Sequence, residues 1–284
     1  MQTTQLAFLG LGVMGAPMAA HLYHANYPIK VYNRSIEKAE GWLKRTGAPE
    51  QLLQHSVAEV VAEADVIFMC LGADHDVLSL CFAEEGLFSA VKPGAVIVDH
   101  TTTSADCARK LSLASAAKGC AFLDAPVSGG QQGAENGALT VMVGGEKLEL
   151  DKVLPLLQCF AKKVEHIGES GAGQLAKMVN QICIAGLVQG LAEGLSFAQN
   201  AGLDARKVVD VISQGAAQSW QMDNRAETMI KGEFDFGFAV DWMRKDLDYA
   251  LAEGRRNGSS LPVTAMVDQF YSEVQKMGGS RWDT

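Results

Sequence analysis

The chain has 284 residues, of which 48% are hydrophobic and 20% are charged. This composition is typical of a folded globular protein and excludes a largely disordered one. The formal net charge of −9 gives no reason to expect broad contact with nucleic acid or with an anionic membrane. The length predicts one large or two medium domains, since domains usually contain about 100–200 residues.

Cysteine and histidine usage indicates neither a disulfide framework nor a metal site. The six cysteines and six histidines are scattered without a C-x-x-C pair or metal-ligand spacing. We therefore expect reduced thiols in a cytoplasmic protein and no bound metal. The segment MQTTQLAFLG lacks the basic and long apolar parts of a signal peptide. No apolar run approaches the ~20 residues of a membrane helix, so no membrane segment is predicted.

The first part of the chain alternates short apolar segments with amphipathic ones. We expect strands at 6–10, 28–33, 64–72, 94–102, 120–130, 138–145 and 163–168. We expect helices at 15–26, 35–45, 104–119 and 146–160. Strands that are apolar throughout and alternate with helices predict a mostly parallel sheet covered on both faces. Residues 1–168 are therefore predicted to form an α/β, doubly wound nucleotide-binding domain of the Rossmann type.

After residue 168 the pattern changes to helices alone. The segment 175–202 is rich in apolar and small residues, as expected for a buried helix. Further helices are expected at 204–215, 219–232, 238–258 and 264–278. Residues 169–284 are therefore predicted to form an all-α domain.

A glycine-rich loop follows the first predicted strand. In FLGLGVMGAPM the glycines have the spacing Gly10-x-Gly12-x-x-Gly15, between a strand and a helix. Gly10 permits a tight turn, Gly12 lets the backbone approach a pyrophosphate, and Gly15 lets helix and strand pack closely. The helix N-terminus offers free N–H groups to the phosphates. We therefore expect a dinucleotide to bind Gly10, Leu11, Gly12, Val13, Met14 and Gly15.

The end of the second predicted strand indicates which dinucleotide is bound. An acidic residue there accepts hydrogen bonds from both ribose hydroxyls and selects NAD, whereas a 2′-phosphate is bound better by arginine. The chain has Asn33, Arg34 and Ser35 at this point. We predict that these three residues bind NADP in preference to NAD, with NAD as the alternative cofactor.

Four motifs, in order, make the whole chain resemble the β-hydroxyacid dehydrogenase family, which includes 3-hydroxyisobutyrate dehydrogenase and several semialdehyde reductases. The motifs are FLGLGVMGAPM, DAPVSGG (124–130), GAGQLAKMVN (171–180) and KDLDYAL (245–251). The resemblance implies that residues 1–168 bind the nicotinamide cofactor and that residues 169–284 serve substrate binding and dimerisation. It also implies hydride transfer between a small carboxylate-bearing hydroxy acid and its semialdehyde or keto acid.

The resemblance implies a catalytic role for Lys177. A protonated lysine can stabilise and protonate a developing alkoxide, and in the oxidative direction the neutral amine acts as the base. Asn180 lies three residues further along the same predicted helix and is expected to orient the lysine and the substrate. The substrate carboxylate is implied to bind Ser128, Gly129 and Gly130, because such a turn can present N–H groups and a hydroxyl to an anion.

Other residues are implied to lie near the cofactor. Thr102 stands three residues after Asp99, as the family pattern requires, although Thr101 and Thr103 leave the register open. Leu71 is implied to pack beside the cofactor.

The helical domain is implied to contribute a lysine and an aromatic residue. Lys245 resembles the family's cofactor-contacting lysine, with Asp246 as its partner. Phe238 corresponds to an aromatic residue that covers the nicotinamide and substrate, although core packing would equally account for it.

Two other functions remain open. An imine reductase has a similar architecture but generally lacks the catalytic lysine, so Lys177 disfavours it. A non-catalytic NADP-binding regulatory protein would have no need of intact Lys177, Asn180 and Ser128. We also expect a homo-oligomer, a dimer or tetramer as in the family. The identity of the hydroxy acid and the physiological direction of the reaction are left undecided.

Overall fold

The computed structural model describes residues 4–284 and comprises two compact units, with the division between Lys177 and Met178. Residues 1–3 lie outside the described part. They belong to the segment 1–10, for which no signal peptide was predicted.

The first unit is built on an eight-stranded sheet with the order β2-β1-β3-β4-β5-β7-β6, in which β8 also pairs with β7. Its strands are β1 (Leu6–Leu9), β2 (Ile29–Tyr32), β3 (Val66–Met69), β4 (Val96–Asp99), β5 (Ala121–Asp124), β6 (Val127–Ser128), β7 (Leu139–Gly144) and β8 (Ala161–Gly168). The neighbours from β2 to β5 are parallel, β7 runs antiparallel to β5 and β6, and β8 runs parallel to β7. The predicted mostly parallel sheet is confirmed.

The predicted single strand at 120–130 was wrong, because it divides into β5 and β6. Pro126 lies in the break between them, and a proline has no N–H group to donate to a neighbouring strand. Its carbonyl oxygen still accepts a hydrogen bond from the N–H of Met142 at 3.1 Å. The pairing with β7 keeps its register across the break, from Asp124 opposite Gly144 to Ser128 opposite Thr140, so β5 and β6 run in the same direction.

Helices connect the strands: α1 (Gly15–His24), α2 (Ile36–Thr46), the 3-10 helix η1 (Glu50–Leu52), α3 (Val57–Val61), α4 (Asp74–Phe82), α5 (Leu87–Ala90), α6 (Ala105–Ala117), α7 (Gly130–Glu135) and α8 (Lys147–Leu157). Five of these elements were not predicted from the sequence: η1, α3, α4, α5 and α7. These elements are short, and short helices depend on tertiary packing more than on a readable periodicity.

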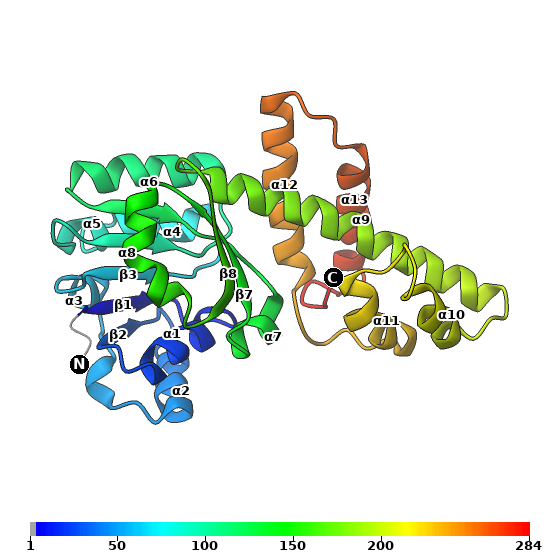
Figure 1. Cartoon of the computed structure of the whole chain (residues 1–284), viewed down its shortest axis with the longest axis horizontal. Helices are drawn as coiled ribbons and strands as arrows, with labels where there is room; N and C mark the ends of the chain where they lie inside the picture. Colours follow the sequence, from blue (N-terminus) through cyan, green and yellow to red (C-terminus); the bar gives the residue numbers. More distant parts are fainter. Residues whose placement is uncertain (1–3) are drawn as a thin grey trace. The chain divides into compact units, whose positions relative to one another are not determined.

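Successive strand residues point to opposite sides of the sheet and build two separate cores. Phe8 belongs to a cluster with buried side chains of α1, α2 and α8, whereas Leu9 belongs to a cluster with those of α3, α4, α5 and α6. Helices therefore cover both faces of the sheet, as Figure 1 shows. This arrangement is the predicted doubly wound fold.

The second unit is helical, as predicted. Its elements are the greater part of α9 (Ala172–Asn200), then α10 (Ala205–Ile212), α11 (Trp220–Lys231), α12 (Val240–Asn257) and α13 (Pro262–Lys276). One apolar cluster joins α9 to α12 and α13, and another joins α9 to α10 and α11. Helix α9 begins three residues before the predicted start at Leu175, so Lys177 lies in its second turn rather than its first.

Among residues 4–284, α9 alone is long and apolar enough to cross a membrane, with a mean hydropathy of 1.3 over its most apolar stretch. Amides, glycines and charged residues interrupt its apolar residues, so α9 contains no uninterrupted apolar run of about 20 residues. Length and composition are weak evidence here, because core helices of soluble proteins meet the same criterion.

Candidate active site

The three glycines of the loop between β1 and α1 are required for different reasons. A Cβ atom on Gly10, whose φ is +98°, would overlap the carbonyl oxygen of Cys70. A Cβ on Gly15 would overlap the carbonyl oxygen of Gly10, so helix and loop could not pack this closely. Around Gly12, by contrast, no atom of the described chain beyond the glycine and its two chain neighbours lies within 4 Å of the Cβ position. This open side fits the close approach of a pyrophosphate, so the loop fits a dinucleotide.

Asn33 ties the end of β2 to this loop. Its Oδ1 accepts a hydrogen bond from the N–H of Leu11 at 2.8 Å, and its Nδ2 donates to the carbonyl oxygen of Ser35 at 2.9 Å. Ser35 stands at the N-cap of α2 without a side-chain bond to the helix. The structure thus gives Asn33 a bracing role that the sequence analysis did not include.

Arg34 extends from the same turn and has an acidic neighbour. Its side chain is 88% exposed, and Nη1 lies 3.3 Å from Oδ1 of Asp76, whose side chain is only 20% exposed. Asp76 belongs to the first turn of α4, a helix that the sequence analysis missed. No sequence signal linked Asp76 to Arg34.

Burial distinguishes the three threonines that follow β4. Thr101 and Thr103 are buried, whereas Thr102 is partly exposed. The Oγ1 of Thr101 accepts a hydrogen bond from the N–H of Leu71 at 2.9 Å, which fixes the predicted cofactor-proximal leucine to this loop. Thr102 is therefore the most accessible of the three, at the sheet edge where open α/β folds bind ligands.

Two buried aspartates end the neighbouring strands β4 and β5. Burial raises the pKa of Asp99 to about 7 and the pKa of Asp124 to about 6, in both cases chiefly because the charged form is desolvated. Asp124 accepts hydrogen bonds from the N–H groups of Gly171 at 2.7 Å and Gln174 at 3.0 Å. It therefore satisfies two donors at the start of α9, where helix N–H groups have no intrahelical partner.

Gln174 is a functional candidate that the sequence analysis missed. Its fully buried side chain donates to the carbonyl oxygen of Thr101 at 2.8 Å and accepts from the N–H of Thr103 at 3.0 Å. The first turn of α9 is thus fastened to both sides of Thr102. Lys177, three residues later, is only 7% exposed. Gln174 stands just before the predicted helix start at Leu175, so no signal in the sequence marked it.

The segment from Ser128 to Gly130 makes the turn between β6 and α7. Gly129 and Gly130 have φ values of +128° and +61°, which favour glycine over any other residue. A Cβ on Gly129 would also lie 3.2 Å from the side chain of Leu139. The two glycines are therefore required for the turn itself, whatever it binds.

In the second unit, one amide joins two of the predicted site residues. Asn180 donates to Oε1 of Gln181 at 2.7 Å, and Nε2 of Gln181 donates to Oδ2 of the buried Asp246 at 2.7 Å. Nζ of Lys245 lies 3.2 Å from Oδ1 of Asp246. The same Nζ lies 5.6 Å from the ring centroid of Trp242 and 5.5 Å from that of Tyr249. Gln181 was not predicted, and it connects Asn180 to the Lys245–Asp246 pair.

Phe238 is held by its backbone. Its N–H donates to Oδ2 of Asp283 at 2.7 Å, and its carbonyl oxygen accepts from the N–H of Thr284 at 3.0 Å. Asp283 is buried and pairs with Nε of Arg225 at 2.7 Å. The Phe238 ring packs partly against the core of α9, α12 and α13, so core packing accounts for part of its environment.

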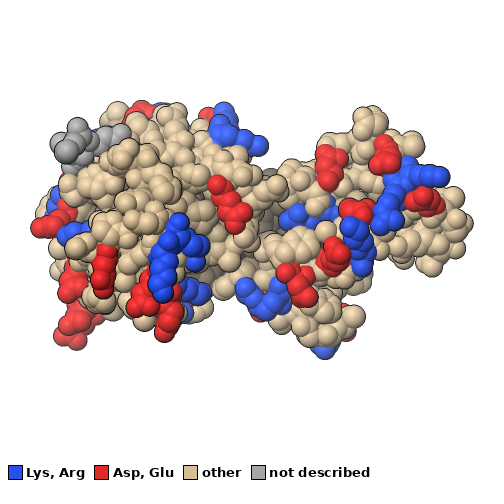
Figure 2. Space-filling view, turned by 90° about the horizontal axis from the view of Figure 1, so that it is seen from below, with Lys and Arg blue, Asp and Glu red and all other residues tan. Residues whose placement is uncertain are grey.

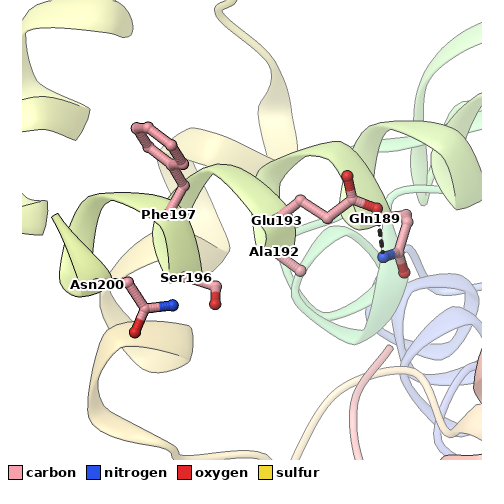
Figure 3. A pocket seen from close by; sticks show the side chains of 6 residues that line it. All are labelled: Gln189, Ala192, Glu193, Ser196, Phe197 and Asn200. Atoms are coloured by element: carbon pink, nitrogen blue, oxygen red, sulfur yellow. Dashed lines mark hydrogen bonds between the residues drawn. The ribbon is translucent and has the colours of Figure 1, made fainter.

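A hollow on the surface of α9 contains none of the predicted site residues. Figure 3 shows that it is lined by one face of this single helix, from Gln189 to Asn200, with the exposed Phe197 beside it. It is open to solvent, and Glu193 is the charged side chain among its lining residues. On the face seen in Figure 2, acidic and basic side chains are interspersed rather than collected into one patch. No cluster of three metal-ligating side chains occurs within residues 4–284.

The described fold and glycine loop define a dinucleotide-binding protein of the Rossmann class followed by a helical domain. Residues 5–168 match the family model described as the NAD binding domain of 6-phosphogluconate dehydrogenase. Residues 171–284 match the model described as the NAD-binding domain of NADP-dependent 3-hydroxyisobutyrate dehydrogenase. The chain belongs to the 3-hydroxyisobutyrate dehydrogenase family, and it is an NAD(P)-dependent oxidoreductase that acts on the CH–OH group of hydroxy acids.

Individual relatives agree over almost the full length. An uncharacterized oxidoreductase of Shewanella frigidimarina is 56% identical over 99% of this chain and 95% of its own. The 2-(hydroxymethyl)glutarate dehydrogenase of Eubacterium barkeri is 34% identical over 99% and 93%. The structure of Mycobacterium tuberculosis 3-hydroxyisobutyrate dehydrogenase with L-serine has a TM-score of 0.88 and 31% identity, covering 99% of this chain and 97% of that one. The predicted family, fold class and enzyme class are confirmed.

Proposed function

We propose that the enzyme interconverts a small 3-hydroxy acid, HOCH2–CH(R)–COO⁻, and its semialdehyde. The names of the relatives support this class. 3-Hydroxyisobutyrate, 2-(hydroxymethyl)glutarate and L-serine all carry a hydroxymethyl group on the carbon that bears a carboxylate. They differ only in R, which the proposed enzyme would select through side chains of the helical domain, residues 169–284.

The burial and anchoring of Lys177 carry the proposal. Its side chain is 7% exposed on a turn of α9 that Asp124 and Gln174 fasten to the ends of β4 and β5. Lysine side chains are mostly exposed, and a buried one usually has a polar or charged partner. We propose that Lys177 takes the proton from the hydroxyl group during oxidation and returns it to the alkoxide during reduction. Asn180, one turn further along α9, would orient the substrate oxygen.

Ser128, Gly129 and Gly130 are proposed to bind the substrate carboxylate through N–H groups and the serine hydroxyl. Phe238 is proposed to cover the reacting carbon. When bound, the nicotinamide accepts the hydride from that carbon or supplies it.

The cofactor would be held by the glycine loop from Gly10 to Gly15, by Leu71 and Thr102, and by Lys245. We propose NADP as the preferred cofactor, because Arg34 at the end of β2 can pair with a 2′-phosphate. The same segment has no acidic residue of its own for the ribose hydroxyls. Asn33 and Ser35 complete this part of the proposed site.

The test is a panel of 3-hydroxy acids and semialdehydes assayed with NADPH and NADH, for the wild type and for Lys177→Met. We expect turnover on members of the HOCH2–CH(R)–COO⁻ class and a loss in kcat of about 10²–10⁴-fold in the variant. A matched control is Lys276→Met, which removes an exposed lysine from α13. Activity on imines alone, or undiminished turnover in Lys177→Met, would contradict the proposal.

We also propose that the enzyme is cytoplasmic and acts as a homo-oligomer. Exposed apolar residues on α9 and α13 support the second part, among them Val179, Phe197, Val263 and Met266. Such surfaces are usually covered in the assembled protein. Light scattering of the purified protein would give the oligomeric state, and a monomer at micromolar concentration would contradict this proposal.

A further inference from the structure

The end of β2 lacks the acidic residue that usually holds the adenosine ribose of NAD, but the fold supplies a carboxylate from elsewhere. Oδ1 of Asp76 lies 3.3 Å from Nη1 of Arg34, and Oδ2 lies 3.5 Å from Nε2 of His75. Arg34 and Asp76 are 42 residues apart in the chain. Their pairing is therefore a product of the tertiary structure.

The sheet order explains where this pair lies. β2 and β3 flank β1 on either side, and all three are parallel. Arg34 follows β2, whereas Asp76 lies in the helix that follows β3. The Arg34–Asp76 pair therefore spans the carboxyl end of β1, where the glycine loop begins. In an open α/β sheet this edge is where the nucleotide binds.

The two acidic residues in the first turn of α4 have different tasks. Asp74 accepts hydrogen bonds from the N–H and the hydroxyl of Ser104, at 2.8 and 2.6 Å, and so serves the start of α6. The carboxylate of Asp76, by contrast, contacts Arg34 and His75. Asp76 is thus placed to meet a ligand bound by Arg34.

We infer that Asp76 sets the cofactor selectivity of this enzyme. Its carboxylate accepts a hydrogen bond from the adenosine ribose hydroxyls of NAD and repels the 2′-phosphate that Arg34 attracts. The enzyme consequently uses both cofactors, with a weaker preference for NADP than Arg34 alone would give. This inference rests on the proposed role of Arg34.

The size of the effect follows from charge. A carboxylate within several ångströms of a phosphate carrying nearly two charges weakens binding by about fivefold to tenfold at low salt, since the site is largely solvated. The repulsion is screened as salt rises. Loss of a hydrogen bond from the ribose hydroxyl weakens NADH binding by about threefold to tenfold.

The experiment measures the dissociation constants of NADPH and NADH by fluorescence titration, without substrate, for the wild type, Asp76→Asn, Arg34→Ala and Glu85→Gln. Glu85 is exposed after α4, so Glu85→Gln removes one negative charge from the same domain as a control. We expect Asp76→Asn to tighten NADPH binding and to weaken NADH binding, which changes their ratio by about tenfold or more. The tightening of NADPH binding in Asp76→Asn should become smaller when the salt concentration is raised from about 0.05 to about 0.5 M, because the Debye length becomes shorter.

The outcomes separate this inference from the proposed function. An unchanged ratio in folded Asp76→Asn, with Arg34→Ala still losing NADPH affinity, overturns the role of Asp76 and leaves the NADP proposal standing. If Arg34→Ala binds NADPH as the wild type does, the proposed NADP preference fails. Weaker NADH binding in Asp76→Asn would then still support the contact with the ribose. A ratio that shifts equally in Glu85→Gln counts against a local role for Asp76.

Discussion

Gln181 donates a 2.7 Å hydrogen bond from Nε2 to Oδ2 of Asp246, joining α9 to α12 through two buried side chains. The same amide accepts from Asn180 at 2.7 Å, and Asp246 pairs with Lys245. Because a side-chain amide has distinct donor and acceptor ends, Gln181 determines which way the amide of Asn180 is turned. The proposed catalytic asparagine and the proposed cofactor-contacting lysine therefore share one support.

Replacing Gln181 by leucine should disturb both Asn180 and the Lys245–Asp246 pair. The change leaves a buried carboxylate without one of its donors, which costs about 1–3 kcal/mol of unfolding free energy. We expect kcat to fall by roughly tenfold or more in protein that remains folded, because Asn180 loses its fixed orientation. Steady-state kinetics and chemical denaturation measure the two effects. Gln189→Leu is the control, since the Gln189 amide donates to the exposed Glu193 of the same helix; equal losses in both variants would contradict the role of Gln181.

The glycine loop offers a matched pair of substitutions. Gly15→Ala should destabilise the protein severely, because the new methyl group would overlap the carbonyl oxygen of Gly10. Gly12→Ala should leave the melting temperature nearly unchanged, because its Cβ position is open, and should weaken cofactor binding by about tenfold or more. Differential scanning fluorimetry with and without NADPH tests both. A Gly12→Ala variant that binds NADPH normally would show that the phosphates do not approach this position.

Asp283 should act on the substrate through Phe238. Asp283→Asn weakens the ion pair with Arg225 and the contact that fixes the N–H of Phe238, and we expect a loss of about 1–3 kcal/mol in stability. Because Phe238 is proposed to cover the substrate, KM for the hydroxy acid should rise by about threefold or more while KM for NADPH stays constant. Phe238→Leu should reproduce the KM effect with a smaller loss of stability. A rise in both KM values would indicate a general loss of structure instead.

The buried carboxyl group of Asp99 should make the stability of the protein depend on pH. Burial raises the pKa of Asp99 from 3.8 to about 7, so between about pH 4 and pH 7 the folded protein keeps a proton that the unfolded chain has lost. The unfolding free energy therefore falls as pH rises through this window, and the contribution is complete only below about pH 4. In Asp99→Asn this part of the pH dependence should vanish.

Urea denaturation at pH 5 and pH 8 tests this directly. The stability of Asp99→Asn relative to the wild type should increase at the higher pH by up to a few kcal/mol, roughly what a shift of about three pKa units can supply. Asp124 contributes with the same sign in both proteins, so most of its contribution cancels in the comparison. A difference that is the same at both pH values would show that Asp99 is charged throughout.

The glycine loop and the lysine helix could be read from the chain because their signals are local. Gly10, Gly12 and Gly15 lie within six residues, and the conformation that each requires depends on its immediate neighbours. The alternation of apolar strands with amphipathic helices likewise needs only a window of about 11–18 residues. The short helices α3, α4 and α5 could not be found in this way, since their stability comes from packing on the sheet.

By itself, then, the sequence determined the doubly wound fold, the helical second part and the nucleotide loop, and its family resemblance pointed to Lys177 as a candidate. Only the tertiary structure decided which distant polar groups meet at the candidate site. Asp76 pairs with Arg34, Asp283 accepts from the N–H of Phe238, and Gln181 donates to Asp246; these pairs are separated by 42, 45 and 65 residues. The physical reason is that strand order and helix packing bring such residues together. A hydrogen bond between residues far apart in the chain produces no periodic sequence pattern, so such a contact cannot be predicted from the sequence.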